Sequence, residues 1–383
     1  MSAQGFALGD RRTIARKLGD ANWLLLALVA AIVAVGVVVL TSVAGGSFEP
    51  WAQRHLERAL VGIALVLCMA VVPLSGWLAL AFPLYLVSLV LLALVPLMGH
   101  EALGARRWIG LGAVSFQPAE LMKIALVLML ARYYQALPAE KVSRPLWVAL
   151  PAMAIGLPVV FVLKQPDLGT AVLFAAVGLA ILFLAGVRFA YLAGLAATIA
   201  LVSPFIWQGL HGYQKARILT FLDPERDPLG TGYHILQSKI ALGSGGLNGK
   251  GYGMGTQSHL DFLPEKHTDF IFTMFAEEAG FVGSVSLLLL YMLLLAVLAH
   301  MAMKCRSQFA RLLIAGFGLV IFIYVFINVA MVTGLAPVVG VPLPLVSYGG
   351  TSMMTVMFGL GLAMSAHVHR RITLKPEDLR HGW

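Results

Sequence analysis

The chain has 383 residues, of which 60% are hydrophobic and only 12% are charged, and its formal net charge is +9. Because soluble domains carry about 25% charged residues, this composition excludes a soluble globular enzyme and any disordered or fibrous class. The two cysteines, Cys68 and Cys305, are too few for a disulfide framework or a cysteine-rich metal site. In so apolar a chain, the basic excess favours anionic lipid over nucleic acid as the partner.

Ten apolar stretches have about the length of a membrane-crossing helix, which needs about 20 residues. Their approximate limits are 22–42, 59–76, 77–97, 117–134, 145–163, 168–186, 188–206, 279–300, 311–334 and 348–367. The apolar core of the first stretch is too long for a removable signal peptide. We therefore expect an all-α polytopic membrane protein with about ten transmembrane helices in one bundle.

The placement of lysine and arginine predicts the orientation of this bundle, because cytoplasmic loops are enriched in both residues. With ten spans, both termini share a side with the loops that carry most of the basic residues. The short loops of the opposite side carry only Arg54, Arg58, Arg106, Arg107 and Lys164. We therefore expect residues 1–383 to form a single membrane domain, with segments 1–21 and 368–383 in the cytoplasm. The long loop 207–268, between spans seven and eight, should be extracytoplasmic.

The fourth span opens with the run Phe116–Lys123. Pro118 suits the first turn of a helix, and Glu120 and Lys123 are then spaced to pair on one helix face. Charged residues inside spans are costly, so both are functional candidates. The alternative is a structural ion pair.

A tight outward turn joins spans five and six and contains Lys164 and Asp167. Asp167 is well placed to cap the sixth helix, where the helix dipole favours a carboxylate. The functional alternative is that both residues line the same outer cavity as Glu120 and Lys123.

The long loop contains two further features. The segment Tyr233–Leu242, with Lys239, alternates polar and apolar faces at helical spacing and is expected at the membrane surface. The run Gly243–Gly251 imitates a phosphate-binding P-loop, but position 244 is serine, position 251 is glycine and no strand precedes it. These departures exclude nucleotide binding, although the N–H groups of the turn could still face a diphosphate. The loop's histidines match no zinc motif.

The eighth span begins near Asp269. Thr268 is a plausible N-cap, which would put Asp269 in the first helical turn, at or just outside the lipid headgroups. A carboxylate there suits a substrate whose tail is in the membrane and whose polar head projects outward, and the alternative is compensation of the helix dipole. Before the tenth span, Pro342–Ser352 should adopt irregular backbone that lines a cavity.

These segments together resemble the SEDS family (shape, elongation, division and sporulation) over nearly the whole chain, and its elongation branch more than its division branch. The matching motifs are Gly104–Ile109, Phe116–Lys123, Lys164–Gly169, Gln237–Gly246, Gly255–Phe270 and Pro344–Gly350.

The resemblance implies a peptidoglycan glycosyltransferase of the cytoplasmic (inner) membrane that polymerises lipid II on the outer face for cell-wall elongation and rod shape. It implies as partners undecaprenyl-diphosphate-linked glycan, a class B penicillin-binding protein (the transpeptidase) and other membrane proteins of the elongation complex. It maps the family's essential aspartate onto Asp269 and three further motif residues onto Glu120, Lys123 and Asp167. Glu265, His267 and Ser347 lie in the matched motifs and are expected to support the site.

The mechanism that we expect uses Asp269 as general base on a sugar hydroxyl, with inversion at the anomeric carbon and a β-1,4 product. Cationic candidates for stabilising the leaving diphosphate are Lys123, Arg106, Arg107, Lys164 and Lys239. A divalent cation, Mg²⁺ or Mn²⁺, could assist them. The competing hypotheses are a lipid II flippase or other transporter, and a non-catalytic scaffold for the transpeptidase.

Overall fold

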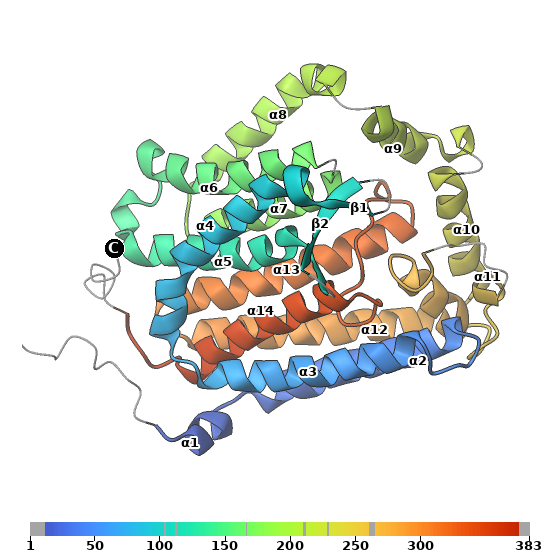
Figure 1. Cartoon of the computed structure of the whole chain (residues 1–383), viewed down its shortest axis with the longest axis horizontal. Coiled ribbons are helices and arrows are strands. Elements are labelled where there is room, and N and C mark those ends of the chain that lie inside the picture. Colours follow the sequence, from blue (N-terminus) through green and yellow to red (C-terminus); the bar gives the residue numbers. More distant parts are fainter. Residues whose placement is uncertain are drawn as a thin grey trace, which may run out of the picture.

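The computed structural model describes residues 12–102, 105–111, 114–165, 167–209, 212–227, 230–259 and 265–374. The long helices form a single bundle in which most lie side by side along one direction, while the helix over residues 189–209 slants away from the others (Figure 1). They are α2 (Trp23–Val43), α3 (Trp51–Val71), α4 (Leu74–Met98), α5 (Pro118–Ala136), α6 (Pro145–Lys164), α7 (Leu168–Leu184), α8 (Phe189–Gly209), α12 (Ile271–Lys304), α13 (Gln308–Val332) and α14 (Gly350–Val368). Each predicted apolar stretch overlaps one of these helices.

Six of the described helices are long and apolar enough to cross a membrane. They are α2, α4, α6, α12, α13 and α14. The helices α7 and α8 have shorter apolar parts, and α3 and α5 carry charged residues among their apolar ones. The chain is therefore a membrane protein whose most apolar helices are evident from hydropathy.

Two helix boundaries differ from the sequence-based limits. The break between the second and third stretches lies at Val72 and Pro73, earlier than predicted, because proline cannot continue the hydrogen bonding of α3. The helix α3 begins at Trp51 rather than near residue 59, since its first turns are polar and escape a hydropathy criterion.

The expected all-α class missed a small antiparallel sheet between α4 and α5. Its strands are β1 (His100–Ala102), β2 (Ala105–Leu111) and β3 (Val114–Phe116), paired in that order. The sheet lies toward the same end of the bundle as α9 (Gly212–Leu222), α10 (Thr231–Ser244) and α11 (Thr256–His259), whereas α1 (Ile14–Gly19) lies at the opposite end (Figure 1). Two short 3₁₀ helices complete the described elements, η1 (Ala139–Lys141) and η2 (Pro224–Arg226).

The glycine-rich run that resembles a P-loop clamps a break in α12. Gly280 interrupts this helix with a φ of 68°, which costs glycine little. The N–H of Phe281 donates to the carbonyl of Gly246 at 2.9 Å, and the N–H of Lys250 donates to the carbonyl of Glu277 at 3.0 Å. The loop thus replaces hydrogen bonds that the break removes. The N–H groups of Lys250 and Gly251 already have partners within the protein and do not face a ligand.

The helix α10 forms as the spacing of Tyr233–Leu242 predicts, but it packs on other helices as well. Its Ser238 is fully buried, and the Ser238 hydroxyl donates a hydrogen bond to the carbonyl of Val332 in α13 at 2.8 Å. The same hydroxyl is hydrogen-bonded to the hydroxyl of Thr273 in α12 at 2.7 Å. The part of the long loop that the structure describes is therefore mostly helical, and its α10 is fixed to the bundle.

Candidate active site

A polar cavity of about 410 Å³ lies where the sheet, the helix ends and two loops meet. Six of the residues that the sequence singled out line it: Arg107, Glu120, Lys123, Asp167, Glu265 and Asp269. They come from β2, α5, the start of α7 and the turn before α12. The fold therefore brings together side chains that are more than 150 positions apart in the chain.

Asp269 is half-buried in a turn that precedes α12. Burial, as the larger cause, and the nearby Glu265 carboxylate together raise the pKa of its carboxyl from 3.8 to about 7, against the opposing effect of Arg217. Gly340 brings backbone close to this carboxylate: a Cβ there would lie 3.2 Å from Oδ2 of Asp269, and φ is +70°. Asp269 is therefore a carboxylate poised near neutral pH at the wall of a cavity.

The predicted cap of the eighth span is wrong. The N-cap of α12 is Phe270, and Asp269 lies before the helix rather than in its first turn. The hydroxyl of Thr268 instead donates to Oε2 of Glu265 at 2.8 Å. The helix therefore starts later than the polar residues suggested, and Asp269 directly precedes its N-cap.

The pair expected from helical spacing on α5 forms. Nζ of Lys123 lies 2.6 Å from Oε1 of Glu120, and it also contacts the hydroxyl of Tyr324 on α13. Both charged side chains are buried. The other oxygen of Glu120, Oε2, is buried without a hydrogen-bond partner in the described part of the chain. This carboxylate is thus able to accept a hydrogen bond from a bound molecule.

Asp167 has both of the roles considered for it. Its carboxylate caps α7 by accepting from the N–H of Thr170 at 3.2 Å and from the Thr170 hydroxyl at 2.9 Å. It also lines the cavity, and NH1 of Arg107 lies 3.7 Å from its Oδ2. Capping therefore does not withdraw Asp167 from the site.

Five other predicted residues do not line the cavity. Arg106, Lys164 and Lys239 are exposed elsewhere on the molecule. His267 stacks on the Trp51 ring, with centroids 4.6 Å apart, and the Ser347 hydroxyl donates to the carbonyl of Thr268 at 2.6 Å. The last two residues support the turn that carries Asp269.

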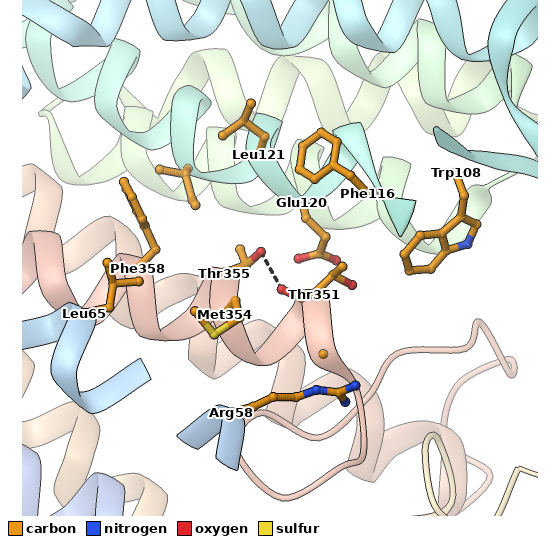
Figure 2. Close-up of a pocket in the computed structure, with 12 residues that line it drawn as sticks. Arg58, Leu65, Trp108, Phe116, Glu120, Leu121, Thr351, Met354, Thr355 and Phe358 are labelled. Carbon is orange, nitrogen blue, oxygen red and sulfur yellow. Dashed lines mark hydrogen bonds between the residues drawn. The ribbon is translucent and has the colours of Figure 1, made fainter. Parts of the chain in front are cut away.

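An open apolar groove of about 620 Å³ adjoins the polar cavity and shares Trp108, Glu120 and Thr351 with it. Figure 2 shows the Glu120 carboxylate pointing from α5 toward Thr351 of α14, with Arg58 of α3 at the far side of the groove. The remaining walls are mainly apolar side chains of α3, β3, α5 and α14: Leu65, Phe116, Leu121, Ile124, Met354 and Phe358. The two spaces together suit a molecule with a long apolar tail and a polar head.

Sequence reasoning missed several residues of these walls. Arg58 entered only the count of loop charges, and Trp108 and Thr351 lie in motifs whose charged or proline residues drew attention first. Tyr324 is one tyrosine in an apolar helix, and only its approach to Lys123 indicates a role. Local patterns give no signal for contacts of this kind.

Among the described residues, no three histidine, cysteine, aspartate or glutamate side chains converge into a metal site. Glu265 and Asp269 line the cavity together. Any Mg²⁺ held there would need oxygen ligands from a bound diphosphate as well, which is how Mg²⁺ commonly binds in phosphate-handling sites.

Comparison with known proteins identifies relatives over most of the chain. A model of the cell cycle protein family that includes FtsW, RodA and SpoVE matches residues 22–372. The peptidoglycan glycosyltransferase MrdB of Escherichia coli K12 is 44% identical over 356 residues, which are 92% of this chain and 94% of that protein. The probable peptidoglycan glycosyltransferase FtsW of Trichlorobacter lovleyi is 37% identical over 361 residues, 91% of this chain and 93% of that protein.

Two solved structures share the fold. One is a chain from work on the coordination of polymerization and crosslinking by a peptidoglycan synthase complex. It has a TM-score of 0.80 and 38% identity, with 92% of this chain and 98% of that chain covered. The other is the rod shape determining protein RodA of Thermus thermophilus, with a TM-score of 0.69 and 34% identity over 92% of this chain and 98% of that chain.

Proposed function

Since this chain belongs to the cell cycle protein family of FtsW, RodA and SpoVE, we propose that it is a peptidoglycan glycosyltransferase that polymerises lipid II with Asp269 as its general base. The observation that carries the proposal is a half-buried carboxylate, with a pKa of about 7, in a polar cavity continuous with an apolar groove. The identity to MrdB supports assignment to cell-wall elongation and rod shape.

The two adjoining spaces fit the two ends of a lipid-linked sugar. The apolar groove between α3, α5 and α14 would take part of the prenyl tail, whose burial is favourable at about 0.8 kcal/mol per methylene. The diphosphate and disaccharide would lie in the polar cavity. Glu120, on the wall of both, has a free acceptor oxygen suited to a hydroxyl or amide N–H of the sugar.

The reaction joins two such molecules. The 4-hydroxyl of one disaccharide attacks the anomeric carbon of another, the bond from that carbon to the diphosphate oxygen breaks, and Asp269 takes the hydroxyl proton. Direct attack inverts the anomeric centre and gives a β-1,4 bond from an α-linked donor. A base works best when its pKa is near the working pH, and such catalysis contributes about 10²–10⁴-fold.

The leaving diphosphate needs positive charge. Lys123 and Arg107 line the polar cavity, and Arg58 lines the groove beside the start of α14. Charges fixed in a partly dry site stabilise a developing anion without the reorganisation that water requires. These three cations are better placed for this role than the exposed Arg106, Lys164 and Lys239.

The same proposal extends to the membrane topology. All ten long helices would cross the inner membrane, the two termini would be cytoplasmic, and the cavity would open at the outer face. The location of α1 at the end opposite the sheet supports this arrangement (Figure 1). By analogy with the synthase complex, a class B penicillin-binding protein would cross-link the new strands.

A flippase would need a polar route that also reaches the inner end of the bundle. The described residues instead form, between α4, α5 and α6, a cavity of about 540 Å³ with almost wholly apolar walls. A pure scaffold gives no reason for a buried carboxylate with a raised pKa in a cavity. Polymerisation therefore explains the site better than either alternative.

The test is synthesis of glycan strands from lipid II by the purified protein, with the products separated on a gel. Wild-type protein should form polymer, Asp269→Asn should form none, and Asp223→Asn should match wild type because Asp223 is an exposed carboxylate that does not line the cavity. Adding the transpeptidase partner should not rescue Asp269→Asn. Polymer at wild-type rate from folded Asp269→Asn protein would refute the assignment of the base, and lipid II flipping without polymer would support transport.

A further inference from the structure

Three consecutive backbone carbonyls in the turn before α12 are each held by a different donor. The N–H of Tyr348 donates to the carbonyl of His267 at 2.9 Å, and the Ser347 hydroxyl donates to that of Thr268 at 2.6 Å. Nδ2 of Asn328 donates to the carbonyl of Asp269 itself at 2.8 Å. Every residue leading into the carboxylate is thus fixed by a neighbouring element.

Asn328 differs from the other two donors because it comes from a long helix, four residues before its C-terminal end. It lies in α13 and is fully buried. The same Nδ2 also donates to the carbonyl of Val341 at 2.7 Å. An asparagine amide has two N–H donors, and here one serves the turn and the other serves the loop before α14. Because both partners are acceptors, only the NH₂ end of the amide can face them.

This double hydrogen bond fixes the spacing between Asp269 and the loop. Val341 directly follows Gly340, whose backbone approaches Oδ2 of Asp269 so closely that a Cβ would lie 3.2 Å from it. One amide therefore holds both the backbone of the carboxylate residue and the backbone on the other side of its side chain. An unpaired N–H buried in an apolar helix would be costly, and the two bonds satisfy both N–H groups of this amide, while its Oδ1 has no hydrogen-bond partner among the described residues.

We propose that Asn328 is the positioning residue of this site: its amide joins the Asp269 turn to the Gly340–Val341 backbone and thereby aims the carboxylate into the cavity. The inference rests on the proposed role of Asp269 as general base. In the described part of the chain, Asn328 is the side chain that makes both of these bonds. Without it, the hydrogen bonds to the carbonyls of this turn would come from Ser347 and Tyr348 of the loop before α14.

The decisive measurement is the kinetics of lipid II polymerisation by Asn328→Leu, which is similar in volume but has no donor. We expect kcat to fall about 10- to 100-fold with little change in KM, because small displacements of a catalytic group are costly. The groups facing Asp269 are Glu265 in its own turn, Arg217 on α9, and the cavity charges of β2, α5 and α7. In the Asn328→Leu protein the turn should be more exposed to water, which lowers the pKa of Asp269. The acid limb of the plot of kcat against pH should therefore shift to lower pH by about one unit.

Two further variants keep the test interpretable. Asn328→Ser keeps one short donor and serves if the leucine variant does not fold; it should show the same lowered kcat and shifted limb. Ser365→Ala removes a buried hydroxyl that joins α14 to the α3–α4 turn at the far end of the bundle, so it should lower stability without moving the limb.

The inference is overturned if folded Asn328 variants keep the wild-type kcat and pH profile, or if their loss of rate merely follows their loss of thermal stability, as in Ser365→Ala. Asp269→Asn separates this failure from failure of the proposed function. If Asp269→Asn is inactive while Asn328→Leu is normal, only the positioning role is wrong. If Asp269→Asn is active, the base assignment itself is wrong.

Discussion

Replacing Asp269 with asparagine should make the folded protein more stable above pH 7 while it abolishes polymerisation. The reason is that burial raises the pKa of this carboxyl from 3.8 to about 7. The folded state therefore holds the proton more tightly than the unfolded chain does. The stability that Asp269 contributes is fully present below pH 3.8 and is lost as the pH rises through 7.

The size of the effect follows from the pKa difference. One pKa unit corresponds to about 1.4 kcal/mol, so ionised Asp269 costs the fold at most about 4 kcal/mol. Partial exposure of the side chain and the hydrogen-bonding needs of an asparagine amide reduce this, and we expect a net gain of about 1–3 kcal/mol for Asp269→Asn at pH 8. The gain should shrink steadily as the pH falls from 7 to 4, because the carboxyl of the folded wild-type protein is then protonated and no longer carries a buried charge.

The assay is thermal unfolding of the detergent-solubilised protein, followed by tryptophan fluorescence at pH 8 and at pH 5. Asp223→Asn is the matched control, since that exposed carboxylate pairs only with Arg226 on the surface in the described structure. An Asp269→Asn protein that melts no higher than wild type at pH 8, or that gains equally at both pH values, would contradict the reasoning. A functional carboxylate in a dry site is expected to reduce stability in this way.

Two further predictions concern the clamp on α12 and the apolar groove. Gly249→Ala should lower the melting temperature much more than Gly246→Ala. Both glycines have positive φ, but only a Cβ at position 249 would meet a backbone atom, at 2.0 Å from the carbonyl oxygen of Glu278. Equal losses of melting temperature in the two variants would exclude the clamp. Thr355→Trp, on the wall of the apolar groove, should raise the KM for lipid II at least about tenfold by excluding the prenyl tail. Leu150→Trp, in the apolar cavity between α4, α5 and α6, should leave KM unchanged. Equal KM values for both variants and wild type would exclude the groove as the site of the tail.

The features that sequence predicted well depend on short-range rules. Glu120 and Lys123 pair because they are three residues apart on a helix, and Asp167 caps α7 because a carboxylate before a helix accepts from its first N–H groups. The apolar stretches became helices because length and hydropathy determine them locally. The resemblance to a family then connected these local features to one reaction.

The features that sequence missed depend on contacts between distant segments. The start of α12 was misplaced because polar residues precede Phe270 without forming a helical turn. Hydropathy treats Asn328 as one polar residue in an apolar stretch, and its partners lie 59 and 13 positions away in the chain. The glycine-rich run resembles a phosphate loop in sequence, and only the break at Gly280 explains it.

The helix α13 provides a common reference for the two charged halves of the site. Tyr324 and Asn328 are four residues apart and therefore lie on one face of this helix, one turn from each other. Tyr324 contacts Lys123 of the pair on α5, while Asn328 bonds the backbone of Asp269. Because a helical turn rises only about 5.4 Å, the cation proposed for the leaving group and the proposed base are held by neighbouring points of one rigid element. A movement of α13 would carry both together, so the spacing between base and cation should be preserved when this helix shifts.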